Sequence, residues 1–350
     1  LGGNHTWSFY HDDLTATQRA FLEPVIAHHW PGYAVRFPEV ARTLPTPYYT
    51  VTSDRLHDVV SDVLGPAVRY NATVTAIAGG TVTVDGHTVT ADLVIDGRGF
   101  APSPHLRYAY QKFLGLEVVL QHPHGQSLPL IMDATVAQAD GFRFVYVLPF
   151  GLDKLFVEDT YYSDRPDHDP RRLRQRLAEY ADSKGWKVER VVREENGVLP
   201  VVMGGDFDDY WASGSGRTAK AGARGAFFHP ITSYSLPEAV KLAAYVAELT
   251  DFDGDRLHMR LKQRAEALWE DGKFYRLLNR MMFRAATPDE RYKIFQRHYR
   301  LKPGLLERFY AGTTTTADKA RLLTGKPPVP VGKAIKAMRP RKKVRVQRKI

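Results

Sequence analysis

Hydrophobic and polar side chains alternate through residues 142–162, which predicts two β-strands joined by a turn at 149–154. The side chains expected on one face of the first strand are Phe142, Phe144, Tyr146 and Leu148. Those expected together on one face of the second strand are Phe156, Glu158 and Thr160. An acid therefore lies in the most aromatic part of the chain.

Glu158 and Asp159 are the two acids of this hairpin, and their position calls for a chemical reason. A carboxyl group on an aromatic-lined face loses hydration in its charged form, so we expect a raised pKa and a proton held near neutral pH. Such an acid can protonate a weak base. The alternative is that Glu158 is a solvated or salt-bridged acid at the sheet edge. Asp159 points to the opposite face by alternation, which indicates a supporting role.

Residues 73–100 predict a small antiparallel meander that leads into a buried strand. Asp85-Gly86 is a hairpin signal, and the apolar run at 93–95 is typical of a buried parallel strand. Gly97 and Gly99 follow directly, where a backbone can approach a ligand closely, although a structural turn also explains them. This order of elements resembles the layout of flavoproteins with a Rossmann-type FAD domain.

Residues 222–242 are a second candidate ligand site, in which a glycine-rich segment precedes an apolar helix. Pro230 and the hydroxyl residues Thr232, Ser233 and Ser235 lie just before that helix. Free N–H groups and the positive end of the helix dipole suit a phosphate or an anionic flavin ring. A well-capped core helix is the alternative.

The remaining elements divide into a strand-rich part and a helical part. Strands are expected at 116–120 and 128–132 and a helix at 170–184, and we interpret residues 112–202 as an antiparallel sheet that carries the substrate. Helical spacing of apolar side chains predicts further helices within 256–284, 288–311 and 318–323.

We predict an α/β fold with four parts. These are a discontinuous, incomplete Rossmann-type FAD-binding domain (1–103 and 213–250), an antiparallel-sheet substrate domain (104–212), a helical region (251–330) and a disordered basic tail (331–350).

The net charge of +10 over 350 residues comes mostly from the tail, since residues 332–350 carry nine basic side chains and no acid. The body is close to neutral, so we do not predict nucleic-acid binding. The absence of cysteine excludes disulfides and thiolate chemistry and fits a reducing cytoplasm. No metal site is predicted, because His28-His29 and the pair His122 and His124 lack a third ligand at a recognisable spacing.

Ordered motifs along residues 1–332 closely resemble those of the bacterial lycopene beta-cyclases. The principal motifs are Asn4-His5-Thr6-Trp7-Ser8-Phe9, Ile95-Asp96-Gly97-Arg98-Gly99, Met132-Asp133-Ala134-Thr135, Phe142-Arg143-Phe144-Val145-Tyr146, Glu158-Asp159-Thr160 and Phe228-His229-Pro230. Further matches include Arg193-Glu194-Glu195 and Tyr234-Ser235-Leu236-Pro237. So many matches in one order are highly specific.

The resemblance implies an FAD enzyme that closes the open ends of lycopene into beta-ionone rings, giving gamma-carotene and then beta-carotene without net redox change. It implies reduced FAD, with NADPH as the electron source. Glu158 is then the acid/base catalyst, supported by Asp159. The residues expected to bind the cofactor are Asp96, Gly97, Gly99, Gly222, Arg224, Gly225, Pro230, Thr232 and Ser233.

Two departures from the family pattern matter. Relatives carry Gly where this chain has Ser233, which narrows the approach of the backbone to a flavin. Family members also have a strand, a Gly-x-Gly-x-x-Gly turn, a helix and a second strand before the segment that matches Leu1. We therefore expect an incomplete sequence record, and weak or no FAD binding by this sequence alone.

Lycopene dissolves in membranes, so the resemblance implies a cytoplasmic enzyme held peripherally at the inner face of the cytoplasmic membrane. The basic tail could attract anionic lipid, or it could be a solubilising tail. Two other functions stay open at this point: a flavin-dependent isoprenoid reductase or hydroxylase, and an inactive apo fragment that only binds lipid.

Overall fold

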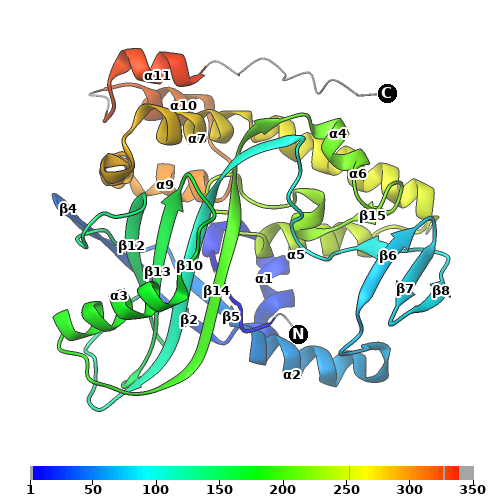
Figure 1. Ribbon diagram of the computed structural model, residues 1–350, viewed down its shortest axis with the longest axis horizontal. Helices are drawn as coiled ribbons and strands as arrows, with labels where there is room; N and C mark the ends of the chain where they lie inside the picture. The colour runs from blue at the N-terminus through cyan, green and yellow to red at the C-terminus, as the bar shows by residue number, and fades with distance from the viewer. Residues whose placement is uncertain (1–2, 252, 326–327, 339–350) are drawn as a thin grey trace.

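The computed structural model describes residues 3–251, 253–325 and 328–338, and a seven-stranded sheet forms its centre (Figure 1). The strand order is β14-β10-β13-β12-β11-β3-β4. The bounds are β3 Tyr33–Phe37, β4 Val40–Leu44, β10 Leu106–Leu120, β11 Leu130–Asp133, β12 Phe142–Pro149, β13 Lys154–Ser163 and β14 Val188–Gly205. Neighbouring strands are antiparallel except β11 and β3, which run parallel.

The predicted aromatic hairpin is confirmed as β12 and β13, with Tyr146 opposite Glu158. The aromatic face packs into a core shared with helices α7 (Lys273–Ala285), α8 (Tyr292–His298) and α9 (Pro303–Tyr310). The other face is covered by α3 (Pro170–Ser183) through Leu173 and Leu177. Side chains alternate along a strand with a period of two, so the sequence pattern correctly assigned residues to the two faces.

The expected composition of the substrate sheet needs correction. Strands β3 and β4 come from the segment assigned to the FAD-binding domain, and β3 joins the sheet through the parallel pair of Leu130 and Ala34. The sheet is therefore mixed rather than purely antiparallel. This pairing joins segments almost a hundred residues apart, and no local pattern encodes it.

A second sheet of three strands, in the order β1-β5-β2, lies beside the first. Its strands and adjoining helices are β1 Thr6–Tyr10, β2 His28–Trp30, β5 Tyr48–Thr52, α1 Ala16–Leu22 and α2 Ser53–Leu64. Phe9 and Val51 are buried in a core that also contains Val240 of α5 (Leu236–Ala247). This core holds the N-terminal segment against the helix that follows the glycine-rich segment.

The predicted meander is confirmed as β6 Val74–Ala78, β7 Thr81–Val84 and β8 His87–Thr90. The strand that follows is β9 (Ile95–Asp96), which pairs in parallel with β15 (Ala219–Lys220). The expectation of a buried strand here is wrong, since Ile95 is 38% exposed. Among the described strands β15 alone pairs with β9.

The helices are otherwise close to the sequence prediction. Their bounds are α3 Pro170–Ser183, α4 Phe207–Ala212, α6 Gly254–Asp271, α7 Lys273–Ala285, α8 Tyr292–His298, α9 Pro303–Tyr310, α10 Thr316–Leu323 and α11 Val331–Met338. The helical segment 256–284 divides at Gly272, where an added Cβ would lie 3.3 Å from the ring of Pro230. Within the described ranges, no helix has the length and apolar character required to cross a bilayer.

The expectation of a disordered tail is wrong for residues 331–338. They form α11, which packs Ala334 and Ala337 into a core with Met281 of α7, beside α10 (Figure 1). Small buried side chains on one side of a helix allow it to pack closely against its neighbour. Residues 339–350 of the predicted tail lie outside the described residues.

Candidate active site

Glu158 lies on β13 at the wall of a cavity of about 180 Å³, which we call the Glu158 cavity. Its neighbours across the sheet are Tyr146 of β12 and Gly115 of β10. The aromatic side chains that line the cavity are Trp7, Tyr10, Phe113, Phe144, Tyr146, Tyr162, Tyr234 and Tyr310. The alternation of β12 and β13 thus directs one carboxyl group into an aromatic enclosure.

The pKa of Glu158 is raised far above its usual range, chiefly because burial removes water from the charged form. The Thr160 hydroxyl donates a hydrogen bond of 2.5 Å to Glu158 Oε1 and lowers the pKa, but by less than burial raises it. A hydrogen bond with Glu195 of β14 also lowers the pKa, and the charge of Asp159 adds a smaller upward influence. This environment raises the pKa of Glu158 to about 7, so the group is protonated in part at neutral pH, and its assignment as the proton donor stays a prediction.

Asp159 faces the other side of the sheet and does not line the cavity. It is fully buried, its Oδ1 lies 2.7 Å from Arg143 Nε, and its Oδ2 accepts a hydrogen bond of 2.5 Å from the Tyr161 hydroxyl. Burial raises the pKa of Asp159 despite the opposing influence of Arg143. An ion pair between neighbouring strands suits a residue that holds the hairpin in place, and removal of one buried partner is strongly destabilising.

Sequence reasoning missed a second acid of the same cavity, Glu195 of β14. Glu158 and Glu195 both pair with Gly115, from the two strands that flank β10. The motif Arg193-Glu194-Glu195 was visible in the sequence, but the register of β14 against β10 decides which of its acids faces the cavity. Only the three-strand pairing reveals this neighbour of Glu158.

Hydroxyl groups form a connected network behind the cavity. The Tyr48 hydroxyl lies 2.9 Å from that of Tyr146 and 3.1 Å from that of Tyr234, and the Tyr146 hydroxyl donates to Ser8 Oγ at 2.9 Å. Burial raises the pKa of each of these three phenols, so they remain neutral. The network satisfies buried polar groups without adding charge near Glu158.

Asp96 is the centre of the first predicted cofactor site. Burial by itself would raise its pKa, but hydrogen bonds from Arg98 and the charge of Arg224 bring the pKa of Asp96 down to about 2. Arg98 Nε and Nη2 each donate at 2.9 Å, and Arg224 Nε lies 3.5 Å from Asp96 Oδ2. The β9/β15 pair therefore brings the Asp96 segment and the Gly222 segment together, as the prediction of a shared site requires.

The glycines predicted to bind the cofactor differ in the space beside their backbones. Gly99 and Gly222 have φ values of +81° and +55°, and an added Cβ at either position would meet no atom within 4 Å. Gly97 has equally open space beside it. Gly225 differs, because a Cβ there would lie 2.9 Å from the carbonyl oxygen of Lys220, so its small size is required for packing within the chain.

Pro230, Thr232 and Ser233 lie on the loop that connects the Gly222 segment with α5. Asn279 Nδ2 donates to the Pro230 carbonyl at 2.7 Å, and Thr232 and Ser233 line the Glu158 cavity. Ser233 has φ +59°, a conformation that favours glycine, and its Oγ donates to the Pro200 carbonyl at 2.7 Å. The predicted cofactor residues thus form two groups, one at Asp96 and one beside Glu158, joined by this loop.

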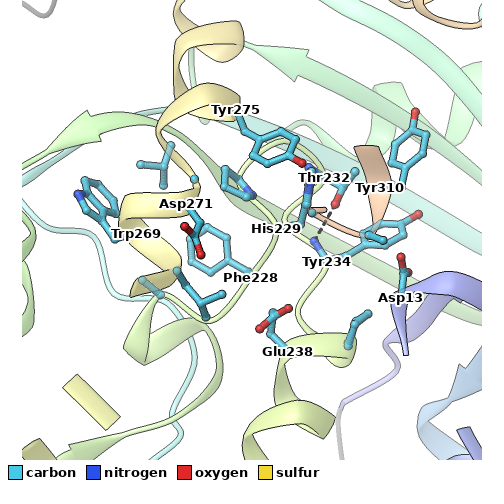
Figure 2. A pocket seen from close by; sticks show the side chains of 18 of the residues that line it. Asp13, Phe228, His229, Thr232, Tyr234, Glu238, Trp269, Asp271, Tyr275 and Tyr310 are labelled. Carbon is cyan, nitrogen blue, oxygen red and sulfur yellow. Dashed lines mark hydrogen bonds between the residues drawn. The ribbon is translucent and has the colours of Figure 1, made fainter. Parts of the chain in front are cut away.

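The same loop also lines a neighbouring cavity of about 250 Å³, which we call the Asp13 cavity (Figure 2). It shares Tyr10, Thr232, Tyr234 and Tyr310 with the Glu158 cavity. Burial raises the pKa of Asp13 to about 7, although the backbone N–H of Tyr10 donates to its Oδ2 at 2.8 Å. Sequence reasoning did not identify Asp13 as part of a site.

Solved structures with this fold include several flavoproteins. A flavin-dependent brominase matches with a TM-score of 0.57 at 12% identity, covering 92% of this chain and 88% of its own. The Klebsiella pneumoniae protein HpxO, solved with FAD and uric acid, matches with a TM-score of 0.55 at 15% identity, covering 88% and 87%. At such low identity these matches establish the fold alone, and they confirm the predicted α/β, Rossmann-type class.

Sequence relatives are much closer. The lycopene beta-cyclase of Pseudescherichia vulneris is 45% identical over 96% of this chain and 87% of its own length, and that of Pantoea ananas is 43% identical over 96% and 88%. The lycopene beta-cyclase of Paracoccus sp. (strain N81106 / MBIC 01143) is 42% identical over 95% and 86%. The family model for lycopene cyclase protein matches residues 1–336. The chain belongs to the lycopene cyclase family.

Proposed function

We propose that the chain is a lycopene beta-cyclase, which closes the open ends of lycopene into beta-ionone rings to give gamma-carotene and then beta-carotene. The observation that carries this proposal is the carboxyl group of Glu158, held in an aromatic cavity that raises its pKa. Membership of the lycopene cyclase family and the names of the three bacterial relatives support the substrate class.

The reaction needs an acid that donates a proton, a cavity that brings the two double bonds together, and a base that accepts a proton. Glu158 donates its proton to a terminal double bond, and a neighbouring double bond then attacks the carbocation and closes the ring. Loss of a ring proton to a carboxylate in the cavity regenerates the acid, so the net reaction is an isomerisation. Phe144, Tyr146 and Tyr162 line the cavity, and the faces of aromatic rings attract positive charge.

FAD fits the residues that were predicted to hold it. Gly97, Gly99 and Gly222 leave open space for a ligand next to the backbone, and Arg224 Nε is buried without a hydrogen-bond partner. Arg224 and the N–H groups of the Gly222 segment would hold an anionic part, and Thr232 and Ser233 would lie nearer the ring system. When bound in its reduced form, FAD supplies electron density that stabilises positive charge, and NADPH would be the electron source.

Glu158→Gln tests the proposed proton donor. Because an amide cannot donate a carboxylic proton, we expect cyclisation to fall by about 100-fold or more. The measurement is conversion of lycopene in vesicles with reduced FAD, followed by chromatography. Glu189→Gln on β14 is the matched control, since Glu189 is exposed and should leave the rate unchanged.

Two outcomes would contradict this proposal. Full cyclisation by Glu158→Gln would remove the residue from the chemistry. Consumption of one NADPH per product molecule would instead identify an oxidoreductase, because an isomerisation needs the reductant only to keep FAD reduced.

The substrate class suggests a cytoplasmic enzyme that contacts the inner face of the cytoplasmic membrane. A candidate contact, which we call the α10–α11 surface, has exposed Leu323, Val331 and Ile335 beside Lys333 and Lys336. Exposed apolar side chains among cations suit insertion into a layer of anionic lipid. An apolar cavity of about 290 Å³ lies beneath, lined in part by Leu323, Val331 and Ile335.

A further inference from the structure

Glu195 and Glu158 occupy the same rung of the central sheet, on either side of Gly115. Adjacent strands are about 4.8 Å apart, so the two glutamate backbones lie roughly 10 Å from each other, and two extended carboxyl side chains can meet between them. An added Cβ on Gly115 would overlap the ring of Phe156 and would lie 3.3 Å from Glu195 Cγ, so only a residue without a side chain lets Glu195 extend over this position. Both side chains line the Glu158 cavity.

We propose that Glu158 and Glu195 form a carboxyl pair that shares one proton at neutral pH, and that Glu195 serves as the acid–base partner of Glu158. This inference rests on the proposed function for its catalytic consequence, but the pair itself is a property of the cavity. The pair would provide an acid and a base together. One carboxyl donates the proton to the double bond, the ring proton returns to the pair, and no proton is gained or lost overall.

The surroundings of Glu195 favour retention of one proton within the pair. Glu195 is 5% exposed, and its Oε2 is buried without a hydrogen-bond partner, 3.7 Å from Arg193 Nη1. Arg193 is itself engaged by Glu117, at 3.0 Å from Oε2, so its charge is divided between two acids. Burial raises the pKa of Glu195, the negative charge of Glu158 raises it further, and Arg193 and Thr6 oppose these effects by less.

Other titratable groups near the pair do not replace this role. They are His5, Glu117, Tyr146, Asp159, Arg193 and Tyr234. Burial lowers the pKa of His5, while burial raises those of Tyr146 and Tyr234, so all three are neutral near pH 7. Two carboxylates in contact repel, and the pair therefore keeps its last proton to a higher pH than either acid would alone.

The test compares Glu195→Gln with wild type over a range of pH. In wild type the alkaline limb reports loss of the last proton of the pair, whereas in Glu195→Gln it reports Glu158 alone, so the limb of the cyclisation rate should move down by about one pH unit or more. At alkaline pH this adds a roughly tenfold loss of rate to the loss at every pH that follows from removing the partner base. Glu195→Asp restores a carboxyl group and should return the limb toward its wild-type position.

Glu194→Gln is the matched control, because Glu194 is the adjacent residue and instead pairs with Arg174. It should leave the pH profile unchanged. A Glu195→Gln profile that coincides with wild type would overturn the proposal, and so would an equal shift in Glu194→Gln.

Infrared titration of the carboxyl groups tests the pair without any turnover. Wild type should show two coupled protonation steps in the cavity, and Glu158→Gln and Glu195→Gln should each show one step at lower pH than the last wild-type step. Independent titration of the two acids would exclude the pair even if cyclase activity is found. A coupled titration in a protein without cyclase activity would contradict the proposed function and leave the pair standing.

Discussion

At the scale of single residues, Glu158 and Asp13 show how burial raises the pKa of an acid that has no cation beside it. Asp159 is as buried as any acid of the chain, but Arg143 lies 2.7 Å away and compensates its charge. Glu158 and Asp13 have no such close cation, and burial dominates the pKa of both. The acids that face the two cavities therefore differ from Asp159 in lacking a close cation.

Asp13→Asn tests this distinction through stability. A folded-state pKa of about 7 lies above the usual 3.8, so the ionised form is disfavoured in the folded protein, and wild type loses stability as pH rises through this interval. Asn keeps an acceptor for the Tyr10 N–H and cannot ionise. The free energy of unfolding of Asp13→Asn relative to wild type should therefore increase by about 2 kcal/mol between pH 5 and pH 8.

Urea denaturation at the two pH values provides the measurement. Asp12→Asn is the control, since Asp12 is the exposed neighbour and should give curves parallel to wild type. If Asp13→Asn also runs parallel to wild type, then the carboxyl group of Asp13 is not perturbed by burial.

At the scale of elements, Gly115 shows why a strand position with no side chain matters. The Cβ of an alanine would overlap the ring of Phe156, with Cε2 at 2.7 Å, and would crowd Glu195 Cγ at 3.3 Å. Both neighbours are packed on the same face of the sheet, so neither can move freely. We expect Gly115→Ala to lower the free energy of unfolding by about 1–3 kcal/mol, as overpacking does in cores, and to separate Glu158 from Glu195.

Chemical denaturation measures the loss of stability, and infrared titration measures the separation of the pair. Gly304→Ala in α9 is the control, because its added Cβ would meet only flexible side-chain ends at 3.4 Å or more. Alanine favours helix, so this variant should be as stable as wild type or slightly more stable. Unchanged stability and unchanged carboxyl coupling in Gly115→Ala would contradict the proposed geometry.

Strands and helices were predictable where hydrophobic side chains repeat along the sequence with a single clear period. The β12–β13 hairpin, the meander and α3 were found because alternation, Asp85-Gly86 and helical spacing act over a few residues. The parallel pair of β3 and β11 was missed because register over long separation depends on the whole fold. The same limit hid Glu195, whose approach to Glu158 depends on two strand registers at Gly115.

At the scale of the whole molecule, the sequence predicted the class of fold but not how its parts share the site. The expected boundary at residue 103 cuts through one sheet, because β3 and β4 complete the layer that carries Glu158. The N-terminal strand β1 also contributes Thr6, Trp7 and Ser8 to the Glu158 cavity. The cavity is therefore assembled from both predicted domains, and a motif read along one segment captures only part of it.

The α10–α11 surface provides the last prediction, which concerns how the whole molecule meets lipid. Each cation near an anionic surface contributes about 1 kcal/mol, so Lys333→Gln with Lys336→Gln should weaken binding to anionic vesicles by roughly 30-fold at low salt. Ile335→Asp should weaken it as well, because Ile335 is 51% exposed and an acid there opposes insertion. Vesicle sedimentation measures both effects.

The matched control removes two cations elsewhere, Arg171→Gln of α3 with Lys187→Gln just before β14, both exposed. Figure 1 shows α3 and α11 at different ends of the central sheet, so the control keeps the net charge of the double variant while sparing the surface. If only net charge mattered, the two double variants would lose affinity equally. A loss confined to the α11 variants, reduced more strongly by added salt for the lysines than for Ile335→Asp, would instead identify an oriented contact in which cations attract the lipid headgroups and apolar side chains enter between them.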